Sequence, residues 1–335
     1  MKSDRSKAAV TTRPAVTIVY VTHRPEPRFA WFADSLAAQL GDDREEVEVI
    51  VVDGLADEER RRAFETGVGD RFAVRVVPAK PTPWNGPYRL TGNEYYGAAS
   101  ARNTGIVCAT APYVVFQDDC SILMSGWWAE VRKAARKDRI VAGACHGHRR
   151  MVVDDGILTG SRAEPAGIDR RWRFGSDTEP VRIGGGELGG GSFGVPRPLL
   201  LAINGFDELC DPIGVEIAQL GRRLELGGTP ILYSRRMLTV RSVERHVQDV
   251  VRTLDKAIDS ADYMAKLAEF GVSNRFFDGT WTSSNLLLDV LFGTRDAAAL
   301  GNDYELALLE ESDLVASGEG FPLDHWFDGQ PLAEM

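Results

Sequence analysis

This chain of 335 residues has few cysteines and no long apolar run, and each shortage narrows what the protein can be. The four cysteines have no metal-type spacing, so we expect free thiols in a reducing compartment. They are Cys108, Cys120, Cys145 and Cys210. No apolar stretch approaches the roughly 20 residues that cross a bilayer, so we expect no membrane insertion.

The termini and the overall charge give weaker limits. Residues 1–13 are polar and lack the apolar segment of a secretory signal, which predicts a flexible N-terminus and a cytoplasmic protein. The net charge of −10 argues against a surface that grips nucleic acid over its whole extent, but it leaves room for a local basic groove. The 44% hydrophobic content suits one large domain or two smaller ones.

The first half of the chain alternates between strand-like and helix-like patterns. Continuous apolar and β-branched runs predict buried strands at 16–22, 47–54, 72–77 and 113–116. Helical spacing of apolar residues predicts helices at 29–40, 56–66, 95–109 and 127–137. This alternation predicts an α/β protein with a mostly parallel sheet and helices on both faces. We also expect a strand at 140–147 and irregular structure at 151–180.

Two adjacent carboxylates at the end of a predicted strand are the most informative feature of the sequence. Asp118 and Asp119 follow the run at 113–116 and Gln117. Carboxylates at the C-terminal end of a parallel strand lie where open α/β sheets bind ligands. Such oxygen ligands hold Mg²⁺ or Mn²⁺, often together with substrate phosphates. An isolated pair of this kind is more often a polar turn, so the neighbouring motifs decide.

Three further motifs accompany the acid pair in a fixed order. A strand at 49–52 ends in Asp53, and residues 99–106 read Ala-Ser-Ala-Arg-Asn-Thr-Gly-Ile. Gly-Gly-Ser-Phe-Gly-Val at 190–195 leads through Asn-Gly-Phe-Asp-Glu at 204–208 to a helix around Glu216. With the acid pair, these motifs make residues 15–246 resemble the GT-A-fold glycosyltransferases, particularly family 2 and its relatives.

The resemblance implies a fold and an activity. The fold is GT-A, a Rossmann-like and mostly parallel sheet in residues 14–246, followed by a helical or irregular C-terminal extension in residues 247–335. The activity is metal-dependent transfer of a sugar from a UDP- or GDP-sugar to a hydroxyl acceptor. Nucleotidyltransferases of related fold usually carry a Gly-rich phosphate loop near the first strand. This chain has Thr-His-Arg-Pro at 22–25 instead.

The resemblance also assigns roles to single residues. Donor contacts would come from Thr22, Asp53, Arg102, Asp118, Gly190 and Gly191. Among them, a guanidinium forks onto phosphate oxygens, and glycine lets the backbone approach a sugar closely. A Mn²⁺ or Mg²⁺ ion would neutralise the charge that grows on the leaving diphosphate.

Several side chains fit the metal-binding positions of the family pattern. Either Asp of the pair fits the metal position, and relatives with the same x-Asp-Asp form favour Asp119. His246, after the last expected core strand, would be a further ligand, with His146 and His148 as weaker competitors.

One position departs from the family pattern. Inverting members need a base for the acceptor hydroxyl, and the family supplies it with the Asp of a Glu-Asp pair. Here Glu216 keeps the first position, but the second is Ile217. Three explanations stay open: Glu216 acts as the base after a small helix shift, the enzyme is retaining, or activity has been lost. Asp211 and Glu208 are nearby carboxylates that would serve as substitutes.

The acceptor is the least defined part of the prediction. The segments 84–87 and 325–332 also resemble predicted bacteriophage glycosyltransferases, which suggests a hydroxymethylated pyrimidine in DNA within the host cytoplasm. Such a base would have to leave the stack to reach the site. A saccharide is the other acceptor, and a non-catalytic nucleotide-sugar binder is the alternative from another class. A homo-oligomer is left open.

Overall fold

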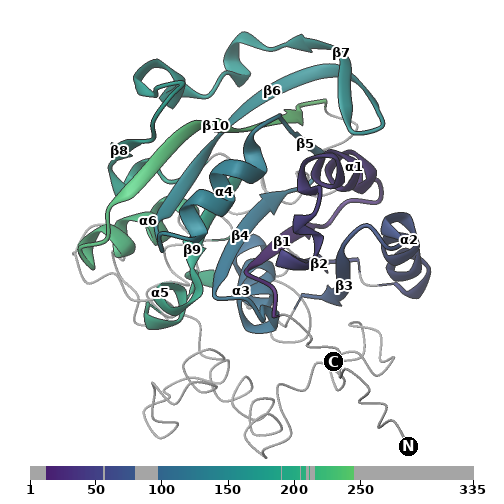
Figure 1. The fold of residues 1–335 in the computed structure, drawn as a ribbon, viewed down its shortest axis with the longest axis horizontal. Coiled ribbons are helices and arrows are strands. Elements are labelled where there is room, and N and C mark those ends of the chain that lie inside the picture. Colours follow the sequence, from purple (N-terminus) through teal and green to yellow (C-terminus); the bar gives the residue numbers. More distant parts are fainter. Residues whose placement is uncertain are drawn as a thin grey trace, which may run out of the picture.

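The computed structural model describes residues 13–55, 57–79, 97–189, 191–203, 205–208, 211 and 216–244. These residues form a ten-stranded sheet with helices on both faces (Figure 1). The strands are β1 (Val16–Thr22), β2 (Val47–Asp53), β3 (Ala73–Pro78), β4 (Tyr113–Asp118), β5 (Ser121–Leu123), β6 (Ile140–Asp154), β7 (Ile157–Ala163), β8 (Val181–Ile183), β9 (Ser192–Pro196) and β10 (Ile231–Ser242). The helices are α1 (Phe29–Leu40), α2 (Glu58–Val68), α3 (Ala98–Cys108), α4 (Trp127–Ala135), α5 (Arg197–Ala202) and α6 (Glu216–Leu226).

The strands run in the order β3-β2-β1-β4-β9-β6-β10-β5 across the sheet. β1 is parallel to β2 and to β4, β2 is parallel to β3, and β6 is parallel to β10. The antiparallel strand β9 joins the two parallel parts, because it pairs with β4 on one side and with β6 on the other. The predicted α/β architecture is therefore confirmed, and the antiparallel strands are an addition to it.

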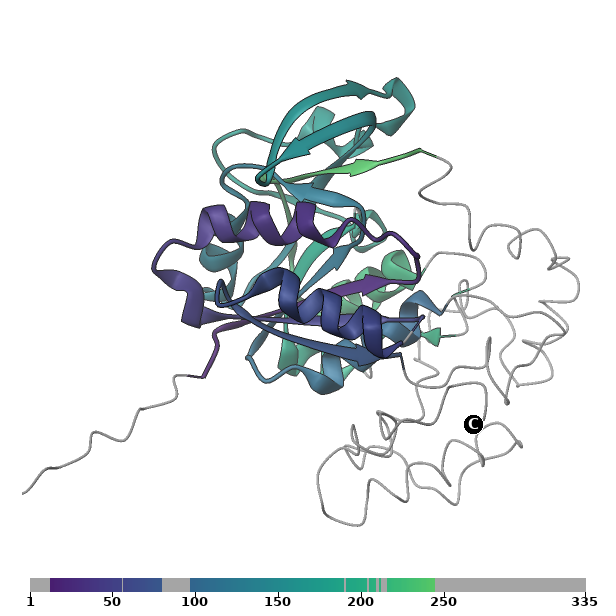
Figure 2. The same cartoon turned by 90° about the vertical axis from the view of Figure 1, so that its right-hand side faces the viewer.

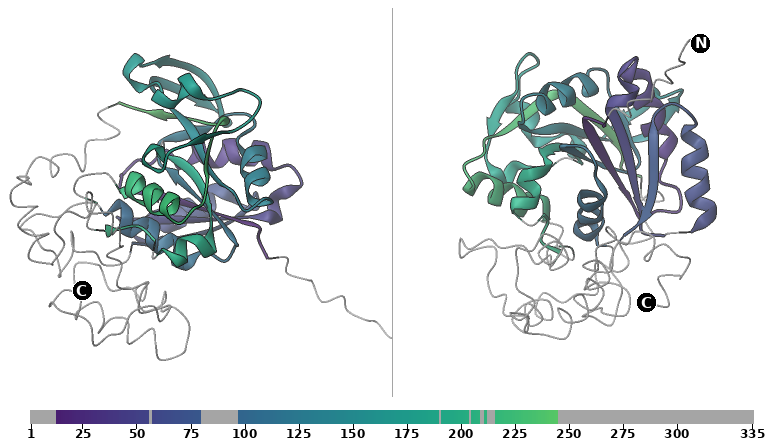
Figure 3. Two further views of the ribbon diagram at one scale, coloured as in Figure 1. Left: turned by 90° about the vertical axis from the view of Figure 1, so that its left-hand side faces the viewer. Right: turned by 60° about the horizontal axis from the view of Figure 1, so that its bottom comes forward.

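Side chains alternate along the buried strands and feed two cores. On β1, Ile18 and Tyr20 join the core under α1, α2 and α4, whereas Val19 and Val21 join the core under α3, α5 and α6. Figure 3 shows the sheet between these helix layers. Helix α3 lies close to the sheet, since a Cβ on Gly105 would meet Val19 Cγ1 at 2.2 Å. This close contact holds the motif residues of α3 against the end of β1.

The segment at 151–180 is more ordered than its sequence predicts. β6 continues to Asp154 and pairs with β7 in a hairpin, and short 3₁₀ turns follow. The hairpin turn curves over α1 (Figures 1 and 2), where Gly156, at φ +74°, lies against the backbone of Asp34 and Ser35. Much of the hairpin surface is exposed, so it shows no apolar alternation, and backbone pairing supplies the order that the pattern did not reveal.

The two strands on either side of the acid pair lie in different parts of the sheet. β4 and β5 are joined only by Asp119 and Cys120, yet β9, β6 and β10 lie between them in the strand order. The sheet therefore curls until β5 pairs antiparallel with β10. The backbone N–H of Ser242 also donates to the carbonyl of Cys120 at 2.9 Å. The acid pair is thus the point at which the sheet closes.

Within the described residues, no helix combines the length and the apolar character that a membrane crossing requires. The expectations for Gly190, Cys210, His246, the loop at 84–87 and the extension at 247–335 fall outside those residues. The predicted domain limits therefore stay predictions.

Candidate functional site

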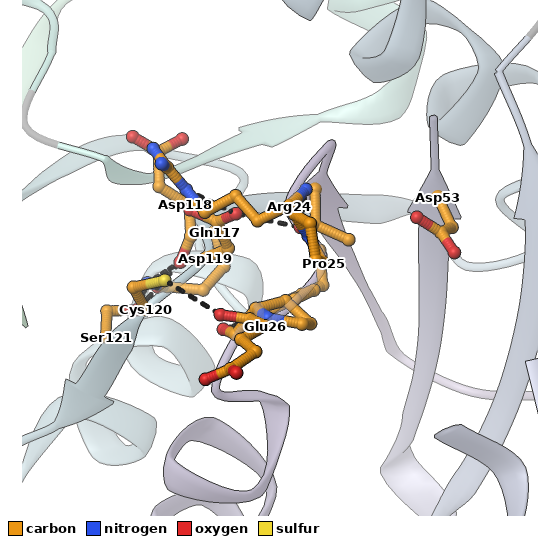
Figure 4. A network of polar contacts seen from close by, with 12 residues as sticks. Arg24, Pro25, Glu26, Asp53, Gln117, Asp118, Asp119, Cys120 and Ser121 are labelled. Atoms are coloured by element: carbon orange, nitrogen blue, oxygen red, sulfur yellow. Dashed lines mark hydrogen bonds and ion pairs between the residues drawn. The ribbon is translucent and has the colours of Figure 1, made fainter. Parts of the chain in front are cut away.

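Four of the predicted site residues lie at the carboxyl edge of the parallel strands. In the register of the sheet, Thr22 is opposite Asp53, and Val21 is opposite Asp118. Figure 4 shows Asp118 at the end of β4 and Asp119 directly after it, near Arg24, with Asp53 at the end of β2. Open α/β sheets bind ligands at this edge. The structure thus brings these side chains to one edge of the sheet, and the roles predicted for them stay predictions.

Asp118 is the more open member of the acid pair. Its side chain is 28% exposed, and its Oδ1 accepts a hydrogen bond from Arg102 Nη2 at 3.0 Å. Its backbone N–H donates to the carbonyl of Gly191 at 2.8 Å. A Cβ on Gly191, which has φ +73°, would lie 2.9 Å from Oδ2. The glycine therefore keeps the space beside that oxygen free, and in the described part of the chain Oδ2 accepts no hydrogen bond.

Asp119 is held by two neighbours on β1 and the loop after it. Thr22 Oγ1 donates to its Oδ2 at 2.8 Å, and Arg24 Nε donates to its Oδ1 at 2.9 Å. Its side chain is 12% exposed. Burial raises the pKa of this carboxyl, and the charge of Arg24 and the hydrogen bond from Thr22 oppose that rise. Arg24 belongs to no motif of the sequence, although it lies only two residues after the end of β1.

Arg102 is buried between two carboxylates. Its Nη1 donates to Glu216 Oε1 at 2.7 Å while its Nη2 holds Asp118, and its guanidinium lies 5.6 Å from the centre of the Phe206 ring. Only 5% of the side chain is exposed. The phosphate contact predicted for Arg102 stays a prediction. What the geometry adds is a guanidinium that links Asp118, at the end of β4, to Glu216, at the start of α6.

At the start of α6, Glu216 and Ile217, which stands where the family pattern has Asp, point to different surroundings. Glu216 is the first residue of the helix and turns toward Arg102, whereas Ile217 packs against the core under α3, α5 and α6. Asp211 Oδ1 accepts a hydrogen bond from the Ala99 N–H at 2.6 Å and so satisfies the N-terminus of α3. Burial and the nearby Glu216 raise the pKa of Asp211 well above its usual range. Both predicted catalytic carboxylates therefore adjoin the site.

Asn103 fastens α3 to the Gly-Phe-Asp-Glu segment. Its Nδ2 donates to Glu208 Oε1 at 2.8 Å and to the carbonyl of Phe206 at 3.0 Å. Its Oδ1 accepts from the N–H of Phe206 at 2.8 Å. All three residues are buried. This network explains in physical terms why the two motifs occur together.

Asp53 is engaged by an arginine that the sequence analysis did not single out. Arg60 donates to its two oxygens at 2.8 and 3.1 Å, and it also donates to the carbonyls of Arg24 and Pro25 at 2.8 and 2.7 Å. Arg60 lies in the first turn of α2, seven residues after Asp53, so helix geometry brings it back to the strand end. The donor contact predicted for Asp53 stays a prediction.

The competing histidines lie in other contacts. His148 Nδ1 is 2.7 Å from Ser161 Oγ on β7. His146 Nδ1 accepts from the N–H of Asp169 at 3.3 Å, and its ring packs against Trp172. Both contacts are local to β6 and the segments that cover it.

The donor set at the acid pair suits a cation that arrives with its substrate. Among the residues that the structure describes, no three His, Cys, Asp or Glu side chains are grouped to hold a metal ion. Mg²⁺ and similar ions are commonly held by one or two carboxylates together with substrate phosphates, rather than in a cage made only of protein. Asp118 and Asp119 match that arrangement.

Comparison with solved structures adds an independent likeness. The crystal structure of GalNAc-T7 with UDP, GalNAc and Mn²⁺ matches with a TM-score of 0.50 and 14% identity, over 90% of this chain and 55% of that one. The fold is that of the GT-A glycosyltransferases. No protein-family model and no curated protein matches the chain in sequence.

Two other matches to the GT-A fold are looser. The mannosyltransferase PcManGT from Pyrobaculum calidifontis, in complex with GDP-Man and Mn²⁺, has a TM-score of 0.48 and 17% identity over 97% of this chain and 86% of that one. The S. aureus TarS fragment 1-349 with UDP has a TM-score of 0.47 and 17% identity, over 95% of this chain and 88% of that one.

Proposed function

We propose that this protein is a glycosyltransferase that moves a sugar from a UDP- or GDP-sugar to a hydroxyl acceptor, with a divalent cation at the acid pair. The observation that carries the proposal is the position of Asp118, an acid with one open oxygen at the carboxyl edge of the parallel strands. The GT-A fold, whose matched member GalNAc-T7 was crystallised with UDP, GalNAc and Mn²⁺, supports this activity.

Both members of the acid pair have a part in holding the cation. Asp118 would hold the cation through Oδ2, the oxygen that Arg102 leaves open. Asp119 would hold it through the oxygen that now accepts from Arg24. When bound, the cation neutralises negative charge on the departing diphosphate. The chain itself positions these carboxylates through Arg102, Arg24 and Thr22, and His246 is the proposed further ligand, since it lies four positions after Ser242, which is hydrogen-bonded beside the pair.

For the acceptor side we propose Glu216 as the base. It is the carboxylate on α6 nearest in sequence to the position where inverting relatives have their Asp, and Ile217 has no group that accepts a proton. Arg102 holds one of its oxygens, which fixes the direction of the carboxylate. Asp211 is the neighbouring carboxylate, and its hydrogen bond to α3 makes it a support for this arrangement. A retaining enzyme would use Glu216 only to position Arg102.

A second candidate is a protein that binds a nucleotide-sugar without transferring the sugar. The core packing of Ile217 favours it, because that position offers no base. The two candidates share the donor site and differ only in turnover. Proposed acceptors for the enzyme are a saccharide or a hydroxymethylated pyrimidine in DNA.

Calorimetry with UDP or GDP, with and without Mn²⁺, tests the donor site. We expect binding that requires Mn²⁺, and we expect it to be abolished in Asp119→Ala and in Asp118→Ala. Lys133→Ala, which changes an exposed ion pair on α4, is the matched control and should bind like the wild type. If both aspartate variants bind nucleotide as the wild type does, the proposed metal site is wrong. Release of sugar from labelled donors separates the enzyme from the binder.

A further inference from the structure

A cavity of about 360 Å³ lies beside the acid pair and has no part in the donor site described above. Its walls come from the middle of β6, from the carboxyl end of β10 and from the segments at 166–171 and 187–189. The volume is at the lower end of the range for small-ligand pockets. It therefore has room for one ring with a substituent.

The floor of the cavity is a rigid and electrically neutral network. Arg171 pairs with Asp169 through two hydrogen bonds at 2.9 and 2.7 Å, and both side chains are buried. Arg171 also donates to the carbonyl of Gly143 at 2.8 Å, and its guanidinium lies 4.7 Å from the centre of the Tyr233 ring. Because these groups satisfy one another, the floor supplies shape rather than a charge for a ligand.

The wall carries one unbalanced positive charge. Arg170 and Glu187 line the cavity as an exposed ion pair with a separation of 3.0 Å. Arg241 lines it as well, and in the described part of the chain its side chain makes no ion pair or hydrogen bond. The charges of Arg171 and Asp169 balance each other, as do those of Arg170 and Glu187. The charge of Arg241 therefore makes the lining of the cavity positive by one unit. A guanidinium in this position suits the fork-shaped recognition of an oxyanion.

The cavity and the acid pair are neighbours. Arg241 pairs with Ser121 in the β10–β5 ladder, two residues after Asp119. Gly189 lines the cavity, and the carbonyl of Gly191 holds the backbone of Asp118. Burial raises the pKa of the Cys145 thiol in the cavity wall, and the charge of Arg241 opposes that rise. A hydroxyl compound in the cavity would therefore lie next to the donor site.

We propose that this cavity is the acceptor subsite and that Arg241 selects acceptors that carry an oxyanion, such as a phosphate, beside the hydroxyl that receives the sugar. The inference rests on the proposed glycosyltransferase function and narrows its acceptor to a single anionic sugar or nucleotide unit. The volume of the cavity limits the acceptor to a single ring, and the guanidinium of Arg241 favours an acceptor with a negative charge.

Matched neutral and anionic compounds test the inference without donor or metal. Calorimetry would compare glucose with glucose 6-phosphate, and 5-hydroxymethyldeoxycytidine with its 5′-monophosphate. A group that binds through a charge-assisted hydrogen bond should favour the anionic member of at least one pair by about tenfold. Preference for the first pair identifies a sugar acceptor, and preference for the second a nucleotide acceptor.

Variants of Arg241 locate the preference in the cavity. Arg241→Gln should remove the preference for the anionic compound, and Arg241→Lys should restore part of it. Arg182→Gln, a change of an exposed arginine on β8 outside the cavity lining, should keep the preference of the wild type. Equal binding of neutral and anionic compounds, or a preference that survives Arg241→Gln, would overturn the inference.

The same variants separate this inference from the donor site. Binding of UDP or GDP with Mn²⁺ should be the same in Arg241→Gln and in the wild type. If the wild type does not bind UDP or GDP with Mn²⁺, the proposed function is contradicted, whatever the result with the anionic compounds. Intact nucleotide binding without a charge preference counts against the acceptor subsite alone.

Discussion

At the residue scale, the site is defined by which carboxylate oxygens are engaged. Asp119 has both oxygens held, Asp53 is held by Arg60, and Asp118 retains one that is open. A sequence shows which acids lie at strand ends, but it does not show which of them a neighbouring arginine already pairs. Arg24 and Arg60 lie outside the recognised motifs, so their ion pairs with Asp119 and Asp53 could not be predicted from the sequence.

In the proposed metal site, Arg24 would compete with the cation for Asp119, because it already holds that carboxylate. Arg24→Gln removes the competing charge and should tighten binding of Mn²⁺ alone by up to about fivefold, the size of a partly exposed ion pair. Titration of Mn²⁺ followed by electron paramagnetic resonance measures the change. Arg28→Gln is the control, because Arg28 pairs with the exposed Glu26 instead. Unchanged or weaker binding in Arg24→Gln would mean that Asp119 is not a metal ligand.

Arg102 has the opposite role, since it compensates two carboxylates at once. Arg102→Met leaves Asp118 and Glu216 without their buried partner and should lower the free energy of unfolding by about 3–5 kcal/mol. Urea denaturation measures this loss. Lys133→Met, at an exposed ion pair, should change stability by less than about 1 kcal/mol.

The cause of that loss is open to a direct check. Adding Asp118→Asn and Glu216→Gln to Arg102→Met should recover part of the stability, because the buried charges are then gone. If the triple variant is no more stable than Arg102→Met, the loss comes from packing against Phe206 rather than from charge.

At the element scale, the position of α3 depends on the absence of a single side chain. Gly105→Ala places a methyl group against Val19 on β1 and should destabilise the protein by about 1–3 kcal/mol, the usual cost of overpacking. Thermal and urea denaturation measure it. Gly67→Ala in α2 is the matched control, because a Cβ there meets nothing within 4 Å, and it should stabilise by roughly 0.5–1 kcal/mol.

A double variant tests whether the cost of Gly105→Ala comes from contact with Val19. Val19→Ala should remove most of the penalty in the double variant, since the two groups that clash are then both small. A Gly105→Ala variant as stable as the wild type would show that α3 shifts freely and does not fix the motif residues.

The elements themselves were largely predictable, and the exceptions have physical reasons. Strands β1, β2 and β4 are buried on both faces and read as continuous apolar runs, so their patterns identified them. The β6–β7 hairpin is largely exposed and carries no such pattern. Contacts that join distant segments, such as Asn103 with Glu208 or Asp211 with Ala99, depend on the folded arrangement and left no trace in local spacing.

At the scale of the whole molecule, acids outnumber bases in the composition, and several acids gather around the described part of the site. Asp118, Glu208, Asp211 and Glu216 surround α3, whose Arg102 pairs with two of them. Burial raises the pKa of Asp211 and of Asp119 above the value of a free carboxyl. These two carboxyls therefore take up protons at a higher pH in the folded protein than in the unfolded chain.

This difference predicts a pH dependence of stability. Because the pKa values of Asp211 and Asp119 are raised in the folded state, the melting temperature should rise as the pH falls from 8 toward the value of the free carboxyl. Glu58, whose pKa is lowered to about 2 by Arg61, opposes this trend only at lower pH, below the pKa of a free glutamate. Asp211→Asn should raise the melting temperature at pH 8 and flatten the profile. A lower melting temperature at pH 8, with an unchanged slope, would contradict it.

The closure of the sheet at Asp119 and Cys120 also governs when the site can assemble during synthesis. The strand that meets β5 is β10, more than a hundred residues later in the chain, and Ser242 completes the turn from that side. When β4 and β5 have left the ribosome, the acid pair is already synthesised, but the contacts with β10 that close the sheet beside it are not yet possible. The described geometry of the acid pair can therefore form only after β10 has been synthesised.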